Sequence, residues 1–156
     1  MSEIINGKEV ARALRESLAA RVVELDKKYG RTPNLVVILV GDDPGSVSYV
    51  TGKAKAATEI GIRNTTIRRP DTITQDELLE LIAELNADDD VDGILVQLPL
   101  PKHINEHYVI QAIAPEKDVD AFHPNNVGHM WLREPMLIPC TPKGIIKLLK
   151  RANVEI

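Results

Sequence analysis

The apolar residues of the chain begin with a helical repeat. The repeat has a spacing of three to four residues and consists of Val10, Leu14, Leu18, Val22 and Leu25. Asn6 precedes it with the side chain of an N-cap residue, and Gly30 follows it as a C′ residue. The pattern predicts an amphipathic helix between Asn6 and Gly30.

Three short segments then have the pattern of strands. The β-branched run NLVVILVG at 34–41 is typical of a strand buried on both faces. The segment IRNTTIR at 62–68 resembles a second strand, and DGILVQLPLP at 92–101 is another buried strand that leads into a proline-rich loop. All three are short enough for strands of an ordinary sheet.

Helical segments alternate with these strands. The segment 46–60 is predicted to be a helix that ends at Gly61. Thr74 and Glu77 form the pattern of a capping box, which predicts a helix over 74–88.

The last third of the chain contains two further helices and a loop. Asn105 is expected to cap a short helix over 105–113, whereas PEKDVDAFHPNNVG at 115–128 has no apolar period and is predicted to be a loop. Thr141 at N-cap and Pro142 at N1 predict the start of the final helix.

The order of these elements predicts an α/β fold. Crossover helices between consecutive strands give a largely parallel sheet flanked by helices, which is a three-layer domain. Ligands of such sheets bind outside the carboxyl ends of the strands. We therefore expect residues 41–46, 97–101 and 118–124 to converge at that edge.

Composition narrows the class of protein. The 156 residues are typical of one domain, and 44% hydrophobic with 3% aromatic residues predicts a core of Val, Ile, Leu and Ala. A net charge of -4 gives no electrostatic case for binding nucleic acid or an anionic membrane. One cysteine, Cys140, excludes an internal disulfide, and the longest apolar run, Leu35–Val40, is too short to span a bilayer. With no secretory signal pattern, we expect a cytoplasmic protein.

Tyr49 and Lys53 lie four residues apart on the helix predicted over 46–60, so both project from one face. Ser46 lies about one turn earlier, where it can also cap the helix. Small neighbouring side chains would let the helix approach the sheet and draw the lysine into a cleft. Desolvation there would lower the pKa of the amine toward neutrality and suit it to acid–base chemistry. Spacing alone favours a simpler interpretation, a solvated lysine beside a partly buried tyrosine.

Polar residues at two loops are candidate ligand contacts. Gln97 closes an apolar strand, where it either meets a ligand or ties down the proline loop that follows. Asp118 and Asp120 place two carboxylates in one loop, and a carboxylate can accept two adjacent N–H donors of an aminopyrimidinone ring. A solvated acidic loop with local turns is the alternative.

Other reactive side chains are assigned no chemistry. His103 and His107 have metal-like spacing, but the Asn105 cap falls between them, so they need not share a helix face. His123 and His129 have no partner at ligand spacing, so we predict no metal site. Cys140 has no His/Asn constellation, which favours a packing role. The segment GDDPGS at 41–46 lacks the lysine of a phosphate loop, and G-x-G-x-x-G does not occur.

Four segments in order resemble one family. They are VGDDPGSVSYVTGKAKAATEIGI at 40–62, DGILVQLPLP at 92–101, PEKDVDAFHPNNVG at 115–128 and PCTPKGI at 139–145. Together they are similar to the bifunctional methylenetetrahydrofolate dehydrogenase/methenyltetrahydrofolate cyclohydrolase family. The resemblance covers most of the chain from Val40 to Ile145.

The resemblance implies roles for six residues. It makes Lys53 and Gln97 catalytic, with Tyr49 stacking on the folate and Asp120 binding the pterin. Ser46 and Pro99 would complete the substrate-binding residues.

Two departures from the family pattern affect these expectations. The family usually has Gly after DVD, where this chain has Ala121, which is strained if the position needs a positive φ. The family also continues into an NADP-binding Rossmann domain, and this chain stops at Ile156. We expect residues 1–142 to be the folate-binding catalytic domain and 143–156 to begin an interdomain helix. The chain would then be a truncated or proteolysed piece of a longer protein.

The resemblance also implies an activity for that parent protein. It would oxidise 5,10-methylenetetrahydrofolate with NADP and hydrolyse the 5,10-methenyl product to 10-formyltetrahydrofolate, as a homodimer and without a metal. The isolated chain would lack the oxidation step. Two alternatives stay open: an aldolase-like enzyme with Lys53 as a Schiff base, and a stand-alone folate-binding module without catalysis.

Overall fold

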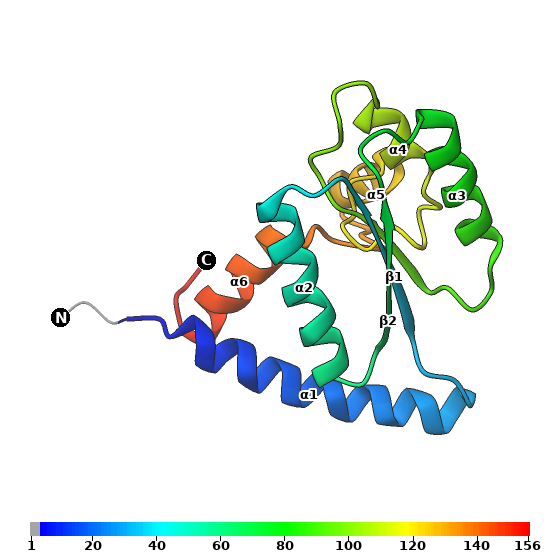
Figure 1. Ribbon diagram of the computed structural model, residues 1–156. Helices are drawn as coiled ribbons and strands as arrows, with labels where there is room; N and C mark the ends of the chain where they lie inside the picture. The colour runs from blue at the N-terminus through cyan, green and yellow to red at the C-terminus, as the bar shows by residue number, and fades with distance from the viewer. Residues whose placement is uncertain (1–3) are drawn as a thin grey trace.

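Three parallel strands form the centre of the molecule, in the order β2-β1-β3 (Figure 1). The computed structural model describes residues 4–156. The strands are β1 (Asn34–Val40), β2 (Arg63–Arg69) and β3 (Gly93–Val96). In the register of the sheet, Leu35 lies opposite Asn64 on one side and Gly93 on the other. The predicted parallel α/β sheet is confirmed.

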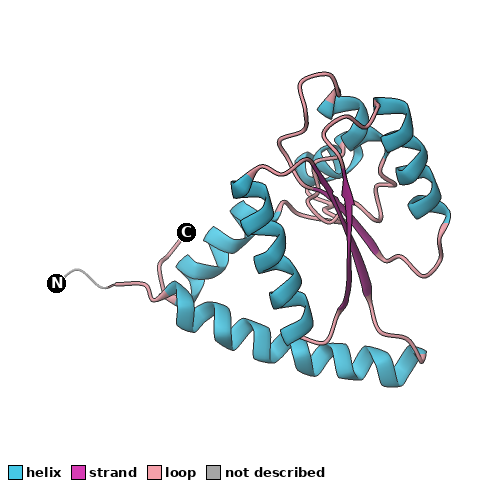
Figure 2. Ribbon diagram, viewed as in Figure 1, coloured by secondary structure: helices cyan, strands magenta, loops and turns pink. Residues whose placement is uncertain are grey.

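Helices cover both faces of this sheet (Figure 2). Within residues 4–156 they are α1 (Gly7–Tyr29), α2 (Pro44–Glu59), α3 (Gln75–Ala87), α4 (Glu106–Ala112), α5 (Pro124–Trp131) and α6 (Cys140–Arg151). None of these helices is long and apolar enough to cross a membrane. The connections β1-α2-β2 and β2-α3-β3 are the expected crossovers.

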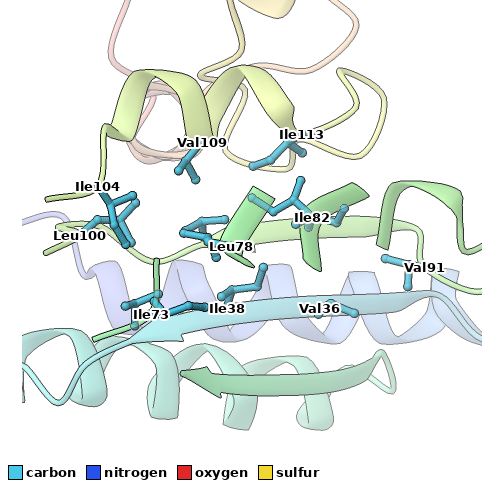
Figure 3. Close-up of a cluster of buried hydrophobic side chains, with 13 residues drawn as sticks. Val36, Ile38, Ile73, Leu78, Ile82, Val91, Leu100, Ile104, Val109 and Ile113 are labelled. Carbon is cyan, nitrogen blue, oxygen red and sulfur yellow. The ribbon is translucent and has the colours of Figure 1, made fainter. Parts of the chain in front are cut away.

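The core lies on both faces of β1, which explains its unbroken apolar sequence. Alternate residues of a strand point to opposite faces. Ile38 packs with Leu78 and Ile82 of α3 in a large cluster (Figure 3), and Val37 packs with Val50 of α2 in a smaller one. Each fully buried Leu, Ile or Val stabilises the fold by about 1.5–3 kcal/mol, so these clusters hold α2 and α3 against the sheet.

Two of the predicted helix termini are confirmed in detail. The side chain of Asn6 accepts a hydrogen bond from the Glu9 N–H, and Gly30 ends α1 in the left-handed conformation with φ 66°. The capping box of α3 is complete, because the Glu77 N–H donates to Thr74 Oγ1 (3.2 Å) and the Thr74 N–H donates to Glu77 Oε2 (2.8 Å). The Glu77 carboxylate accepts from both the N–H and the hydroxyl group of Thr74, and these two hydrogen bonds hold the pKa of Glu77 below its usual value.

Two predicted N-caps were wrong. Asp43 caps α2, accepting the Ser46 N–H at 2.8 Å, so Ser46 lies inside the first turn. Asp43 comes before Pro44, which takes the N1 position that suits its fixed φ. Helix α6 likewise begins earlier than predicted, at Cys140, with Pro139 at the N-cap position and no side-chain cap.

The predicted loop at 115–128 was also partly wrong, because α5 begins at Pro124. His123 caps this helix, with its Nδ1 atom accepting the Asn125 N–H at 3.0 Å. The helix has only 8 residues, and the one it buries fully is polar, Asn126. An apolar period therefore had no room to show in the sequence.

Candidate active site

The Lys53 amine and the Gln97 amide meet at the carboxyl end of β3. The Gln97 N–H donates to the Ile38 carbonyl of β1 (2.9 Å), which extends the ladder by one residue and fixes the backbone of Gln97. Lys53, on α2, donates from Nζ to Gln97 Oε1 at 3.1 Å. Gln97 Nε2 in turn donates to the Leu98 carbonyl at 2.6 Å. The amide therefore holds the amine and ties down its own loop, and the two interpretations of Gln97 are compatible.

Asp120 lies close enough to Lys53 for the two charges to interact. Its segment runs beside β3, where the Ile94 N–H donates to the Lys117 carbonyl at 2.7 Å and Asp118 forms an isolated parallel bridge with Ile94. Burial raises the pKa of Asp120; the positive charge of Lys53 opposes this rise and the negative charge of Asp118 adds to it. An amine, an amide and a carboxyl group from three distant segments thus gather at one end of the sheet.

The other three predicted contact residues, Tyr49, Ser46 and Pro99, differ in how far their side chains are exposed to solvent. The Tyr49 side chain is 69% exposed, one turn before Lys53 on α2, so its ring face is open. Ser46 is 4% exposed, and Pro99 is exposed after a cis peptide bond from Leu98. The expectation from spacing alone is reversed, because the tyrosine is exposed and the lysine is partly covered.

Asp118 and Asp120 have different environments, which the sequence alone did not distinguish. Asp118 is 2% exposed, and its Oδ2 atom accepts the His123 N–H at 2.8 Å and the Asn126 Nδ2–H at 3.2 Å. Asn126 is itself 1% exposed and also donates to the Pro115 carbonyl at 2.8 Å. Sequence reasoning missed Asn126, because nothing in its local pattern marks it as buried.

The family model for the tetrahydrofolate dehydrogenase/cyclohydrolase catalytic domain matches residues 5–120. The chain belongs to this family. It is 57% identical over 152 residues to Bifunctional protein FolD of Brevibacillus brevis, covering 97% of this chain and 53% of that protein. The chain spans about half the length of the curated relatives that it matches.

Two crystal structures of the tetrahydrofolate dehydrogenase/cyclohydrolase family have the same fold over this region. The bifunctional enzyme FolD of Campylobacter jejuni, a methylenetetrahydrofolate dehydrogenase/cyclohydrolase, gives a TM-score of 0.94 at 46% identity and covers 97% of this chain and 54% of that chain. The FolD of Trypanosoma brucei, solved with NADP cofactor and inhibitor, gives 0.95 at 39% identity and covers 99% and 53%.

The position where the family usually has glycine adopts the conformation that glycine favours. Ala121 has φ 56° and is fully buried, and its N–H donates to the Asp118 carbonyl at 3.1 Å. A side chain in this region costs about 1–2 kcal/mol. The departure from the family pattern therefore keeps the turn and adds strain to it.

Helix α6 begins beside the acidic segment. Cys140 Sγ donates to the Val119 carbonyl at 3.5 Å. Burial, followed by the negative charge of Asp120, raises the pKa of Cys140. A thiol with a raised pKa is a poor nucleophile. Cys140 is exposed to solvent by surface area, so its packing role stays a prediction.

The hollow behind Asp120 is small. Its volume is about 10 Å³, which is at the lower limit for a single bound water. Larger hollows of about 400 and 380 Å³ lie elsewhere, one beside Arg69 and α3 and the other between α1 and α6. Among residues 4–156, no three His, Cys, Asp or Glu side chains gather as metal ligands would.

Proposed function

We propose that this chain is the folate-binding catalytic part of an enzyme with two activities. The first is NADP-dependent oxidation of 5,10-methylenetetrahydrofolate to the 5,10-methenyl form, and the second is hydrolysis of that product to 10-formyltetrahydrofolate. The observation that carries the proposal is the 3.1 Å bond from Lys53 Nζ to Gln97 Oε1, with Asp120 in electrostatic range. The relatives named above support the choice of substrate.

Asp120 and Tyr49 hold the folate in this proposal. A carboxylate accepts two neighbouring N–H groups, as the pterin ring offers, and burial strengthens such bonds. The partial burial of Asp120 therefore favours binding of a donor pair over solvation. The open Tyr49 ring stacks on the folate and limits its orientations. Ser46 lies at the start of α2, and Pro99 follows the end of β3. Both are further substrate contacts in this proposal.

Lys53 transfers protons during hydrolysis. Water adds to the cationic methenyl carbon and loses one proton to the amine, which leaves a neutral hydroxyl adduct. The bond from that carbon to N5 then breaks as N5 takes a proton from the amine, while the hydroxyl group loses its remaining proton to solvent and becomes the formyl carbonyl. A neutral Lys53 amine can take the first proton and supply the second. Gln97 Oε1 keeps the amine in place throughout, because it accepts from either charge state.

NADP does not fit the residues of this chain. A dinucleotide fold needs glycines spaced G-x-G-x-x-G to approach the pyrophosphate, and none of the 9 glycines here is followed by another at two residues. In the oxidation reaction, the residues of this chain therefore only hold the folate while it loses a hydride. We propose that residues 1–142 form the folate domain, that 143–156 lead to a separate NADP-binding domain, and that the whole protein is a cytoplasmic homodimer.

Replacing Lys53 with methionine tests the proposal. Lys53→Met keeps the unbranched apolar part of the side chain and removes the amine, so we expect hydrolysis to fall by about 10²-fold or more. The measurement is the loss of methenyltetrahydrofolate absorbance with the chain in excess. Lys55→Met on the exposed side of α2 is the matched control and should hydrolyse like the unchanged chain.

Two outcomes would contradict the proposal in different ways. Hydrolysis in Lys53→Met at the rate of the unchanged chain would reject the role of the amine. Folate binding without any turnover in the unchanged chain would favour the alternative, a binding module without catalysis.

A further inference from the structure

The Asp118 carboxylate is buried yet lies outside the group of Lys53, Gln97 and Asp120. Burying a carboxylate is costly unless hydrogen bonds compensate it. Here the Oδ2 atom accepts two bonds, one from the His123 backbone and one from the Asn126 side chain. Both donors belong to the start of α5, so Asp118 fastens that helix to the segment beside β3.

The same residue closes the turn that carries Asp120. The Ala121 N–H donates to the Asp118 carbonyl at 3.1 Å, which makes Asp120 a central residue of a four-residue turn. The Asp118 N–H is held by the Ala114 carbonyl at 3.0 Å. Backbone and side chain of Asp118 are therefore both fixed, two residues before the carboxyl group that faces Lys53.

The other side of the segment is fixed as well. Lys117 Nζ donates to the carbonyls of Leu85, Asn86 and Asp88 at the end of α3, at 2.8–3.1 Å. Neighbouring residues thus attach the segment to α3 on one side and α5 on the other. A turn held from both sides presents its central side chain in one orientation.

We propose that Asp118 is a positioning residue, whose buried carboxylate, held by His123 and Asn126, fixes the turn that presents Asp120 to the pterin ring. This inference rests on the proposed function for its ligand. Asp118 itself stays out of contact with the folate and acts through Asp120. The groups whose charges reach Asp120 are Lys53 of α2 and Asp118, and the charge of Asp120 in turn reaches the Cys140 thiol at the start of α6.

A double-mutant cycle on folate binding tests the inference. The probe is 5-formyltetrahydrofolate, titrated calorimetrically against the 156-residue chain. We expect Asp118→Ala to raise the dissociation constant about tenfold, and to have no further effect in an Asp120→Ala background, because it acts through Asp120. Asp89→Ala, at an exposed acid, is the control and should leave binding unchanged. Equal losses in both backgrounds, or no loss in a folded Asp118→Ala chain, would overturn the proposal.

A second readout needs no ligand and separates this inference from the proposed function. The Asp120 carboxyl group is titrated by carbon NMR in the unliganded chain. Removing the Asp118 charge and releasing the turn should both lower the titration midpoint of Asp120, and an unchanged midpoint would reject the positioning role. If Asp118→Ala does not fold, Asn126→Ala removes one of the two donors and should shift the midpoint in the same direction. If the variants shift the Asp120 midpoint as expected but the unchanged chain binds no folate, the proposed function is rejected and the positioning role of Asp118 is retained.

Discussion

At the scale of single residues, burial distinguishes two neighbouring acids that look alike in the sequence. Asp118 and Asp120 share a loop in the sequence, and composition or spacing treats them alike. The structure gives Asp118 two hydrogen-bond donors from α5 and leaves Asp120 partly open beside Lys53. Only the family resemblance singled out Asp120, because the partners of Asp118 lie on a helix that the apolar pattern did not reveal.

Asp120 should lower the stability of the chain at neutral pH. Its pKa is raised in the folded state, chiefly by burial, so the folded chain holds this proton more tightly than the unfolded chain does. Stability from this group is therefore greatest at pH values below the unfolded pKa, and falls as the pH rises through the folded pKa. Asp120→Asn removes the buried charge, and we expect a higher urea midpoint than the unchanged chain at pH 7.

The pH dependence checks the cause of that gain. The difference between Asp120→Asn and the unchanged chain should shrink as the pH is lowered, because the carboxyl group then carries its proton in both states. Asp89→Asn, at an exposed acid, should shift the midpoint little at any pH. A lower midpoint for Asp120→Asn at pH 7 would mean that the attraction to Lys53 outweighs desolvation.

At the scale of elements, the sequence predicted the helices and strands whose signals are local. Asn6 and Thr74 cap their helices as their side chains indicated, and the apolar runs of β1 and β3 are buried. Helix α5 was predicted to be a loop because it is held in place by the His123 N-cap and the buried Asn126 side chain and has no apolar repeat. Hydrogen bonds to distant residues leave no periodic trace in a sequence.

Gly93 permits the acidic segment to lie against β3. A Cβ atom at this position would collide with the side chain of Val119, between the two acids. We expect Gly93→Ala to lower the free energy of unfolding by about 1–3 kcal/mol, because overpacking forces backbone shifts. Folate binding should weaken too, since the turn that carries Asp120 moves.

Gly52→Ala is the matched control for Gly93→Ala. Gly52 lies inside α2, and a methyl group added there would have no neighbouring atom within 4 Å, so alanine should stabilise the chain by about 0.5–1 kcal/mol. Urea unfolding of both variants gives the comparison. A Gly93→Ala chain as stable as the unchanged one would show that Val119 can move aside freely.

At the scale of the whole molecule, the topology of the sheet could be predicted from the sequence, whereas the number of residues buried on each face of the sheet could not. Parallel strands with crossovers bring their carboxyl ends together, and the expected convergence of 97–101 with 118–124 is seen in the Asp120 environment near Lys53. Lys53 reaches that edge from the middle of α2, and its position depends on how α2 packs on the sheet through residues such as Val50. Among residues 4–156, the cluster facing α3 has 13 buried members and the one facing α2 has 4.

This imbalance predicts uneven local stability. Helix α6 buries no residue fully, and α1 buries only Val22. We expect amide hydrogens of α6 to exchange at least about 10²-fold faster than those of β1, because an element with little buried apolar surface opens without global unfolding. Hydrogen exchange followed by mass spectrometry measures both in one experiment, and equal protection of α6 and β1 would contradict this picture.

The orientation of the Gln97 amide has a consequence for the direction of the reaction. Its nitrogen is committed to the Leu98 carbonyl, so only the oxygen faces Lys53. The oxygen can accept a hydrogen bond from the amine both before and after a proton leaves, so the pair of side chains needs no rearrangement between the two charge states. If this pair of side chains opens the five-membered ring as proposed, the same pair should also close it, and the return from formyl to methenyl folate would use Lys53 and Gln97 alike.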